Sequence, residues 1–166
     1  MSRDRRTGNV LGLVAVVDAM SSQQDVTSRV DLLRQSYADI GGPAPDQWER
    51  LLSVPADRTV TLVNLFAFRD IADYGDTLEP PVTGADAFNR YAAVSAPTLD
   101  GVGGRFVHFG SHRGTLVGDE ETWDLVVVGE YPSLDALLAL HEDPAYQDAY
   151  RHRVAACARQ QVLISA

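Results

Sequence analysis

VTLVNLFAFR, residues 60–69, is the stretch of this chain that decides the fold. It is apolar at nearly every position and has neither Gly nor Pro, which is typical of a strand buried on both faces. Alternate side chains of a strand point to opposite faces, so one face carries Leu62, Asn64, Phe66 and Phe68. We expect this bulkier face to line a cavity and the other face to pack under helices. That other face carries Val63, Leu65 and Ala67.

The pattern after this strand follows the order β-α-β-β-α-β. Strands are predicted at residues 60–69, 105–112, 123–131 and 162–164, and helices at 86–96, from 134 to a break near Pro144, and at about 145–160. This order predicts an α+β, ferredoxin-like fold. Right-handed crossovers place both helices on one face of the sheet. The other face must be covered, and a second copy of the chain is the simplest cover, so we predict a homodimer.

The chain divides into a mostly helical N-terminal extension, residues 1–56, and a ferredoxin-like domain, residues 57–166. The extension begins with an apolar run at residues 10–17, and a new helix is predicted to start near Ser21. Apolar residues at steps of four and three form one stripe on this helix. They are Val26, Val30, Leu33, Tyr37 and Ile40.

Composition and charge exclude several classes of function. The net charge of −9 over 166 residues argues against a nucleic-acid partner and against an anionic membrane surface. The single cysteine, Cys157, excludes an internal disulfide and a cysteine-based metal cluster. The apolar run after the N-terminal arginines loosely imitates a signal peptide, but Asp18 follows it at once. No run is long enough for a transmembrane helix, and we expect a cytoplasmic protein.

Several short motifs over residues 57–165 occur in an order that resembles a bacterial family known as a domain of unknown function. The motifs are Val63-Asn64-Leu65-Phe66-Ala67-Phe68-Arg69, Phe88-x-x-Tyr91, Gly103-Gly104-Arg105, Trp123-Asp124-Leu125, Tyr131-Pro132-Ser133, Asp143-Pro144-Ala145-Tyr146-Gln147 and His152-Arg153. The resemblance implies a dimeric α/β barrel, the superfamily of antibiotic-biosynthesis monooxygenases and muconolactone isomerase. It does not imply one activity, because this superfamily hosts many reactions. His141 departs from the pattern, since an apolar residue is expected there.

Three residues are candidate catalytic groups. His108 alternates with Phe106 on the second strand and is expected to face the cavity, where it would act as acid or base. Asn64 would donate to a developing oxyanion, and Tyr91 would polarise a carbonyl group. Each also has a structural reading: His108 as a hydrogen-bonded core residue, Asn64 as a tie to a backbone carbonyl, and Tyr91 as packing.

Six further residues are candidates for substrate binding. Aromatic side chains would hold an apolar body, and charged or imidazole groups near strand ends would clamp polar groups. They are Phe66, Phe68, Phe106, His112, Arg105 and Asp124. Surface ion pairs explain the charged members equally well. His152 and Arg153 on the last helix are expected to be structural.

These observations predict a small-molecule enzyme of the isomerase, cyclase or lyase type, which uses acid–base chemistry without a bound cofactor or metal. Its substrate would be an apolar, aromatic or polyketide-like metabolite. Two alternatives stay open: a cofactor-independent monooxygenase of the same fold, and a non-catalytic ligand-binding or accessory protein. A third, a haem or metal enzyme, would use His108, His112 or His141.

Overall fold

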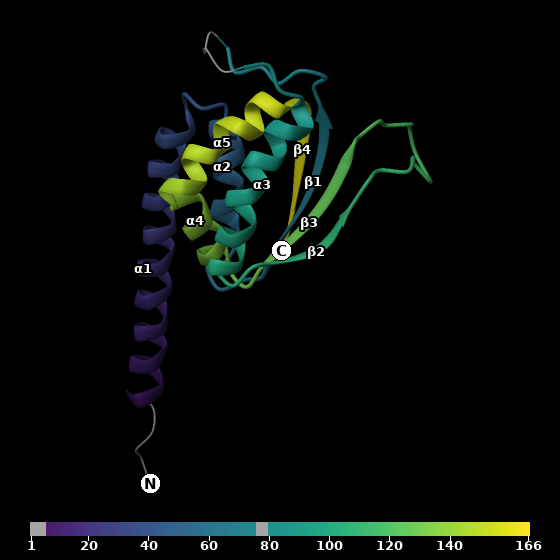
Figure 1. The fold of residues 1–166 in the computed structure, drawn as a ribbon. Helices are drawn as coiled ribbons and strands as arrows, with labels where there is room; N and C mark the ends of the chain where they lie inside the picture. Colours follow the sequence, from purple (N-terminus) through teal and green to yellow (C-terminus); the bar gives the residue numbers. More distant parts are fainter. Residues whose placement is uncertain (1–5, 76–79) are drawn as a thin grey trace.

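The computed structural model describes residues 6–75 and 80–166, with side chains from residue 20 onward. Its main body is a four-stranded antiparallel sheet in the order β2-β3-β1-β4, with helices on one face (Figure 1). The strands are β1 (Val60–Phe68), β2 (Arg105–Gly110), β3 (Leu125–Tyr131) and β4 (Cys157–Ser165). The helices of this body are α3 (Gly84–Gly101), α4 (Leu134–Glu142) and α5 (Pro144–Ala156). The fold is α+β and ferredoxin-like, as predicted.

Each helix of this body begins at a side chain that caps its first turn. The hydroxyl of Thr83 accepts from the Asp86 amide, and the hydroxyl of Ser133 accepts from the Ala136 amide. Asp143 accepts from the amide of Tyr146 at the start of α5. These caps satisfy amides that have no partner inside the helix. They fix the residue at which each helix begins.

Two predicted boundaries were wrong. Pro97 does not end α3, which runs on to Gly101. A proline removes one backbone hydrogen bond, and here the rest of the helix outweighs that loss. Cys157 does not lie on a helix, because β4 starts at this residue and spans nine residues. The pairing of β4 with β1 along nearly its whole length overrides the helical pattern of the sequence.

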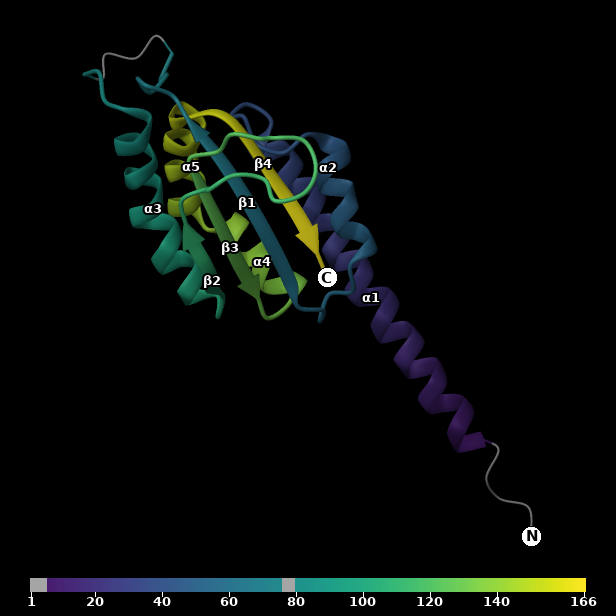
Figure 2. The same ribbon diagram turned by 90° about the vertical axis from the view of Figure 1, so that its right-hand side faces the viewer.

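The predicted assignment of the two faces of β1 was only half right: the bulkier face lines a cavity as expected, but that same face, and not the other, lies under the helices. Leu62 and Phe66, which are 9% and 2% exposed, lie on the helix-covered face of the sheet. Val63, Leu65 and Ala67 are half-buried and lie on the face without helices. Figure 2 shows this open face, with only the segment between β2 and β3 crossing in front of it. The bulkier side chains are under the helices because only that side offers an apolar layer deep enough to bury them.

The N-terminal part forms a helical layer beside α4 and α5. It consists of α1 (Arg6–Tyr37), α2 (Pro45–Glu49) and a short 3-10 helix, η1 (Arg50–Ser53). Because α1 is one continuous helix, the predicted separate start near Ser21 was wrong. Four residues of the predicted stripe are buried, with exposures of 2% or less. They are Val26, Val30, Leu33 and Tyr37.

An arginine fastens this helical layer to the ferredoxin-like body. Arg29 on α1 donates to the carboxylates of Asp135 and Glu142, which lie at the two ends of α4. A guanidinium that bridges two carboxylates fixes orientation as well as distance. The layer is therefore held in one position against the helices that cover the sheet.

None of the helices in the described part of the chain has the length and apolar character needed to cross a membrane.

Candidate functional site

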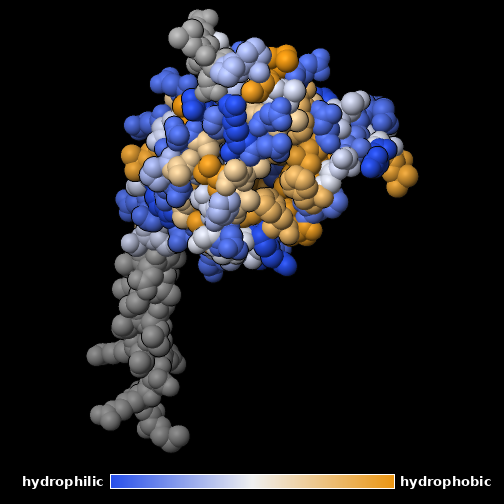
Figure 3. All heavy atoms as spheres, viewed as in Figure 1, coloured by the Kyte–Doolittle hydropathy of each residue, from blue (hydrophilic) through white to orange (hydrophobic). Residues whose placement is uncertain are grey.

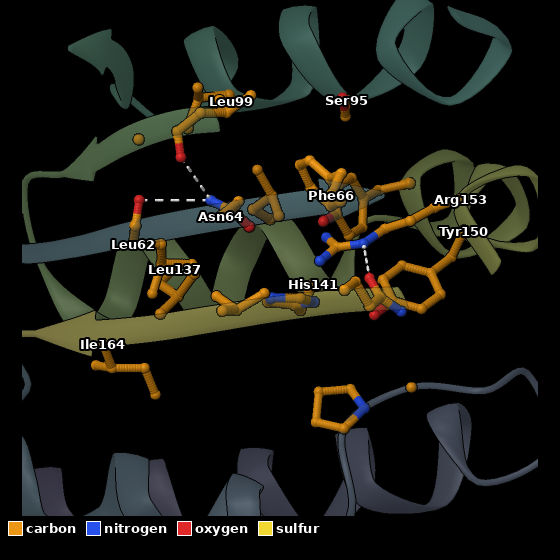
Figure 4. A pocket seen from close by; sticks show the side chains of 18 of the residues that line it. Leu62, Asn64, Phe66, Ser95, Leu99, Leu137, His141, Tyr150, Arg153 and Ile164 are labelled. Atoms are coloured by element: carbon orange, nitrogen blue, oxygen red, sulfur yellow. Dashed lines mark hydrogen bonds between the residues drawn. The ribbon is translucent and has the colours of Figure 1, made fainter. Parts of the chain in front are cut away.

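A cavity of about 410 Å³ lies between the helix-covered face of the sheet and the surrounding helices. Figure 4 shows its interior, with β1 and β4 as the floor, α3 along one side and the N-terminal layer along the other. Its volume falls in the range of small-molecule sites, and its walls are mostly apolar and aromatic. Residues that represent these walls are Leu62, Phe66, Phe88, Leu99, Leu137 and Tyr150.

The mouth of the cavity is apolar. Phe106 and Phe109 line the cavity from β2, yet they are 47% and 62% exposed. Figure 3 shows apolar residues gathered on this face of the molecule, between the helices and the edge of the sheet. An apolar mouth of this kind favours the entry of an apolar molecule.

A buried cation lies in the cavity wall. Arg153 on α5 is 6% exposed, and its Nε donates to Gln160 Oε1 at 2.8 Å while its Nη1 donates to the Tyr91 hydroxyl at 3.3 Å. The guanidinium also lies over the rings of Phe66 and Tyr150, at 5.0 and 5.3 Å. Among the described residues no carboxylate forms an ion pair with Arg153. A buried charge normally has such a partner.

The remaining nitrogen of this guanidinium faces the cavity. Within residues 20–75 and 80–166, the buried side-chain nitrogens without a hydrogen bond are Trp48 Nε1 and Arg69 Nε. Arg153 Nη2 makes no hydrogen bond there either, so it is not enclosed by protein. Figure 4 shows the guanidinium directed into the cavity. It can therefore donate to a bound molecule.

Three tyrosines surround this cation. The hydroxyls of Tyr91 and Tyr146 are 2.8 Å apart and hydrogen-bonded. Burial raises the pKa of Tyr146 and of Tyr150 above the ordinary value, so both are neutral at physiological pH. Burial acts to lower the pKa of Arg153, but the neighbouring tyrosine oxygens outweigh it and hold that pKa high. The guanidinium of Arg153 therefore stays protonated, and this wall of the cavity carries a positive charge.

A histidine lies in the same wall. His141 on α4 lines the cavity, and its ring contacts the rings of Tyr146 and Trp48 edge to face, at 5.3 and 5.2 Å. Burial, followed by the charge of Arg153, lowers its pKa to about 3. The imidazole is therefore neutral at physiological pH and can accept a hydrogen bond or a proton.

A model of the family described as "Domain of unknown function (DUF1330)" matches residues 78–166, more than half of the chain. The chain belongs to the DUF1330 family. The matched region contains the residues of α3, α4 and α5 that line the cavity.

The chain is also similar to solved structures of proteins of unknown function. The RPA0582 protein of unknown function from Rhodopseudomonas palustris is 30% identical and superposes with a TM-score of 0.67, over 75% of this chain and 93% of that one. Its methylated form gives 30% identity and a TM-score of 0.68, over 75% and 91%. A dimeric ferredoxin-like protein of unknown function from Bacteroides fragilis is 16% identical, with a TM-score of 0.43, over 64% and 94%. No match was found among curated proteins.

Four of the predicted site residues line the cavity of this DUF1330 protein. They are Asn64, Phe66, Tyr91 and Phe106. The amide nitrogen of Asn64 lies 3.4 and 3.3 Å from the backbone carbonyls of Leu62 and Val127, so it makes two long bonds within the sheet. Phe68 lies outside the cavity and packs against Phe88, with ring centroids 5.0 Å apart.

His108 does not face the cavity, and the predicted orientation was wrong. A bulge in β2 places Phe106 opposite Gly129 and His108 opposite Val128, so Val107 is skipped in the pairing. Gly129 lines the cavity, whereas Val128 lies on the open face, and His108 shares the face of its partner. Strict alternation fails at a bulge because one strand carries an extra residue.

The other three predicted residues also lie outside the cavity. Arg105 is exposed and forms an ion pair with Glu130 at 2.7 Å across the open face. Asp124 accepts from the Phe68 amide at 2.7 Å and thus extends the ladder between β3 and β1. His112 is half-buried in the segment after β2. The contact of Arg105 is the surface ion pair given above as its alternative, whereas the contact of Asp124 is with a backbone amide.

Two polar groups of the cavity wall were not predicted as site residues. Arg153 was expected to be structural, although the His152-Arg153 motif was part of the family resemblance. The one signal for His141 was its departure from an expected apolar residue. Trp48 and the Gly41-Gly42-Pro43 turn, which line the cavity from the N-terminal layer, carried no signal at all.

The four histidines do not form a metal centre within the described residues, where no group of three or more His, Cys, Asp or Glu side chains is placed to hold an ion. His141 is in the cavity wall, whereas His108 lies on the open face. The haem or metal alternative named His108, His112 or His141 singly, and it stays a prediction.

The shifted pKa of His141 predicts that acid destabilises the fold. The folded-state pKa of about 3 lies below the ordinary 6.5, so the unfolded chain binds the proton first as pH falls. The free energy of unfolding should therefore decrease from pH 6.5 downward, and this histidine should account for about 2 kcal/mol between pH 7 and pH 5. In urea titrations His141→Asn should lose that much less stability over this interval than the wild type.

His112→Asn serves as the control, since it removes a histidine outside the cavity. It should keep the wild-type loss of stability with acid. Equal losses for His141→Asn and the wild type would show that the ring titrates in the folded protein as it does in water.

Proposed function

We propose that this protein is a small-molecule enzyme whose cavity binds an apolar, aromatic or polyketide-like acid and moves a proton on it without a bound cofactor. The observation that carries the proposal is Arg153, a buried cation in the wall of an apolar cavity that forms no ion pair with a carboxylate of the described residues. Burying such a charge costs stability, and the cost is recovered when an anionic group binds beside it.

The chemistry follows from the groups that line the cavity. His141 Nε2 would take a proton from a carbon next to a carbonyl, and the electron pair of that C–H bond would move onto the carbonyl oxygen. Arg153 and the hydroxyl of Tyr91 would donate to the resulting enolate oxygen. If the deprotonated carbon also carries a C=C bond, the enolate is a dienolate: the proton returns to the far carbon of that bond, the electron pair on oxygen re-forms the carbonyl, and the C=C bond moves by one position. The histidine is restored, and no oxidant or metal is consumed.

A bound carboxylate would itself assist this base. One of the two causes that lower the pKa of His141 is the charge of Arg153. A carboxylate beside the guanidinium offsets that charge, and the histidine becomes a stronger base when the ligand is present.

A non-catalytic carrier is the second candidate, and one observation favours it. With a pKa of about 3, His141 is a weak base at neutral pH. Efficient general bases have pKa values near the working pH. A protein that only binds its ligand needs no such base.

Replacement of Arg153 by Met should abolish the preference for acids. Cinnamate should bind the wild type at least tenfold more tightly than cinnamamide, which has the same shape but no charge, in isothermal titration calorimetry. Arg153→Met should lower the affinity for cinnamate at least 30-fold, about 2 kcal/mol, because a truncated charge pair costs this much or more. The free energy of unfolding should stay within about 1 kcal/mol, since Met avoids the cost of burying a charge.

Arg159→Met is the matched control, because this arginine is half-exposed and paired with Glu121 away from the cavity. It should leave the affinity for cinnamate unchanged. Equal binding of acid and amide by the wild type would overturn the proposed anionic ligand.

Proton transfer is tested by isotope exchange in D₂O. Phenylpyruvate is an aromatic acid with an enolisable C–H bond, and the wild type should speed the exchange of its benzylic protons, as followed by NMR. His141→Asn should slow this exchange about 100-fold, the usual contribution of a general base. Binding of phenylpyruvate with exchange at the rate of the buffer would support the carrier and contradict the enzyme.

We also propose that the open face of the sheet is covered by a second copy of the chain. Val63, Val128 and Leu163 form neighbouring pairs on this face, and Leu163 is 48% exposed. Val107, at the bulge of β2, is 55% exposed. A self-complementary apolar face suits a two-fold dimer.

Charge on this face should dissociate the dimer. Leu163→Glu should shift the mass from dimer to monomer in light scattering, because two carboxylates would be buried in the interface. Leu32→Glu, at a position on α1 that is 63% exposed, should keep the wild-type mass. A wild-type monomer at micromolar concentration would refute the proposed assembly.

A further inference from the structure

Tyr37 is the last residue of α1 and lies behind the cavity wall rather than in it. It is 1% exposed, and its ring packs edge to face against His141, with centroids 5.5 Å apart. It also contacts the ring of Trp48 at 5.4 Å. Tyr37 therefore touches two residues of the wall without reaching the ligand space.

Two contacts join Tyr37 to His141. The Tyr37 hydroxyl donates to the backbone carbonyl of His141 at 3.2 Å, and its oxygen is also 3.2 Å from His141 Nδ1. A hydroxyl has a single hydrogen, so both contacts can be hydrogen bonds only if Nδ1 carries the imidazole proton and donates it to the tyrosine oxygen. Nε2 is then left with a bare lone pair.

The lone pair of His141 Nε2 faces the cavity. No hydrogen bond involves His141 Nε2 in the described part of the chain, and Nε2 is not among the enclosed nitrogens without a partner. Since His141 lines the cavity, Nε2 is the acceptor that it presents there. Arg153 in the same wall supplies only hydrogen-bond donors, whereas the tyrosine hydroxyls both donate and accept.

We infer that Tyr37 is a positioning residue that holds His141 with a bare Nε2, and that the cavity thereby selects acids that also present a hydroxyl donor to this nitrogen. The inference rests on the proposed binding of an acid at Arg153. It names the ligand more closely, as a hydroxy-substituted apolar carboxylic acid.

The side chains that lie between Arg153 and His141 suit such a ligand. Arg153 contacts the Tyr91 hydroxyl at 3.3 Å, Tyr91 contacts Tyr146 at 2.8 Å, and the ring of Tyr146 contacts His141. The cation and the acceptor are thus separated by aromatic side chains. A ligand with a carboxylate and a hydroxyl at opposite ends of an aromatic body matches this order of groups. Its hydroxyl occupies the single lone pair of Nε2, so such an acid is bound without removal of a C–H proton.

Tyr37 lies outside residues 78–166, the part that the family model matches. His141 and Arg153 lie inside that part. The N-terminal layer therefore supplies the residue that positions His141, and the matched region does not contain this residue.

The tautomer can be observed directly. In the full-length protein with ¹⁵N-labelled histidine, the wild-type spectrum should show His141 protonated at Nδ1 and bare at Nε2 at pH 7. Tyr37→Phe keeps the ring and removes the hydroxyl, so it should shift the ring toward protonation at Nε2. Protonation of Nε2 in the wild type would overturn the inference.

Ligand selection is measured with paired probes. The wild type should bind 4-hydroxycinnamate at least tenfold more tightly than 4-methoxycinnamate, because only the first presents a hydrogen to Nε2. Tyr37→Phe should reduce this ratio at least fivefold. His141→Asn, whose amide can still donate to Tyr37, should bring the ratio close to one. Tyr74→Phe removes the hydroxyl of a different tyrosine–histidine pair, Tyr74 with His152 at 2.7 Å, and should leave the ratio unchanged.

An unchanged ratio in Tyr37→Phe would refute the role of Tyr37, and it would leave binding at Arg153 intact. Loss of the preference of the wild type for cinnamate over cinnamamide would instead refute the proposed acid site. The two failures are therefore distinguishable.

Discussion

The site depends on one constraint: Arg153 is buried with its positive charge, and no carboxylate within residues 20–75 and 80–166 pairs with it. Its stem leaves α5, and its head is held by Gln160 on β4 and Tyr91 on α3. Aromatic faces of Phe66 and Tyr150 complete the enclosure. Desolvating a guanidinium in this way opposes folding, and the surrounding rings and oxygens offset part of that cost. The site keeps a charge that only an anion can neutralise.

The fold explains why that charge can be kept. In a ferredoxin-like sheet both crossovers lie on one face, so α3 and α5 meet above β1 and leave a space over its middle. The N-terminal layer closes the open side of this space with α2 and the turn before it. Arg29 fixes that layer to α4, the helix that carries His141. Support for the site therefore comes from both parts of the chain.

Periodicity predicted the architecture well and the site poorly. The buried strand at residues 60–68, the order of elements and the apolar stripe of α1 all follow from local patterns that burial imposes. Asn64, Phe66 and Tyr91 were placed at the cavity for the same reason. His108 was misplaced because a bulge, which has no periodic signature, shifts β2 by one residue. Arg153 was undervalued because a sequence does not show whether an arginine has a partner.

The sequence by itself determined the α+β class, the family and the apolar stripe by which α1 is buried, because these depend on the spacing of apolar residues and on short motifs. The tertiary structure alone decided which face of β1 lies under the helices, which polar groups share one wall, and that Tyr37 reaches His141 across 104 residues of chain. Hydrogen bonds between distant residues depend on distance and direction in space. A linear sequence records neither.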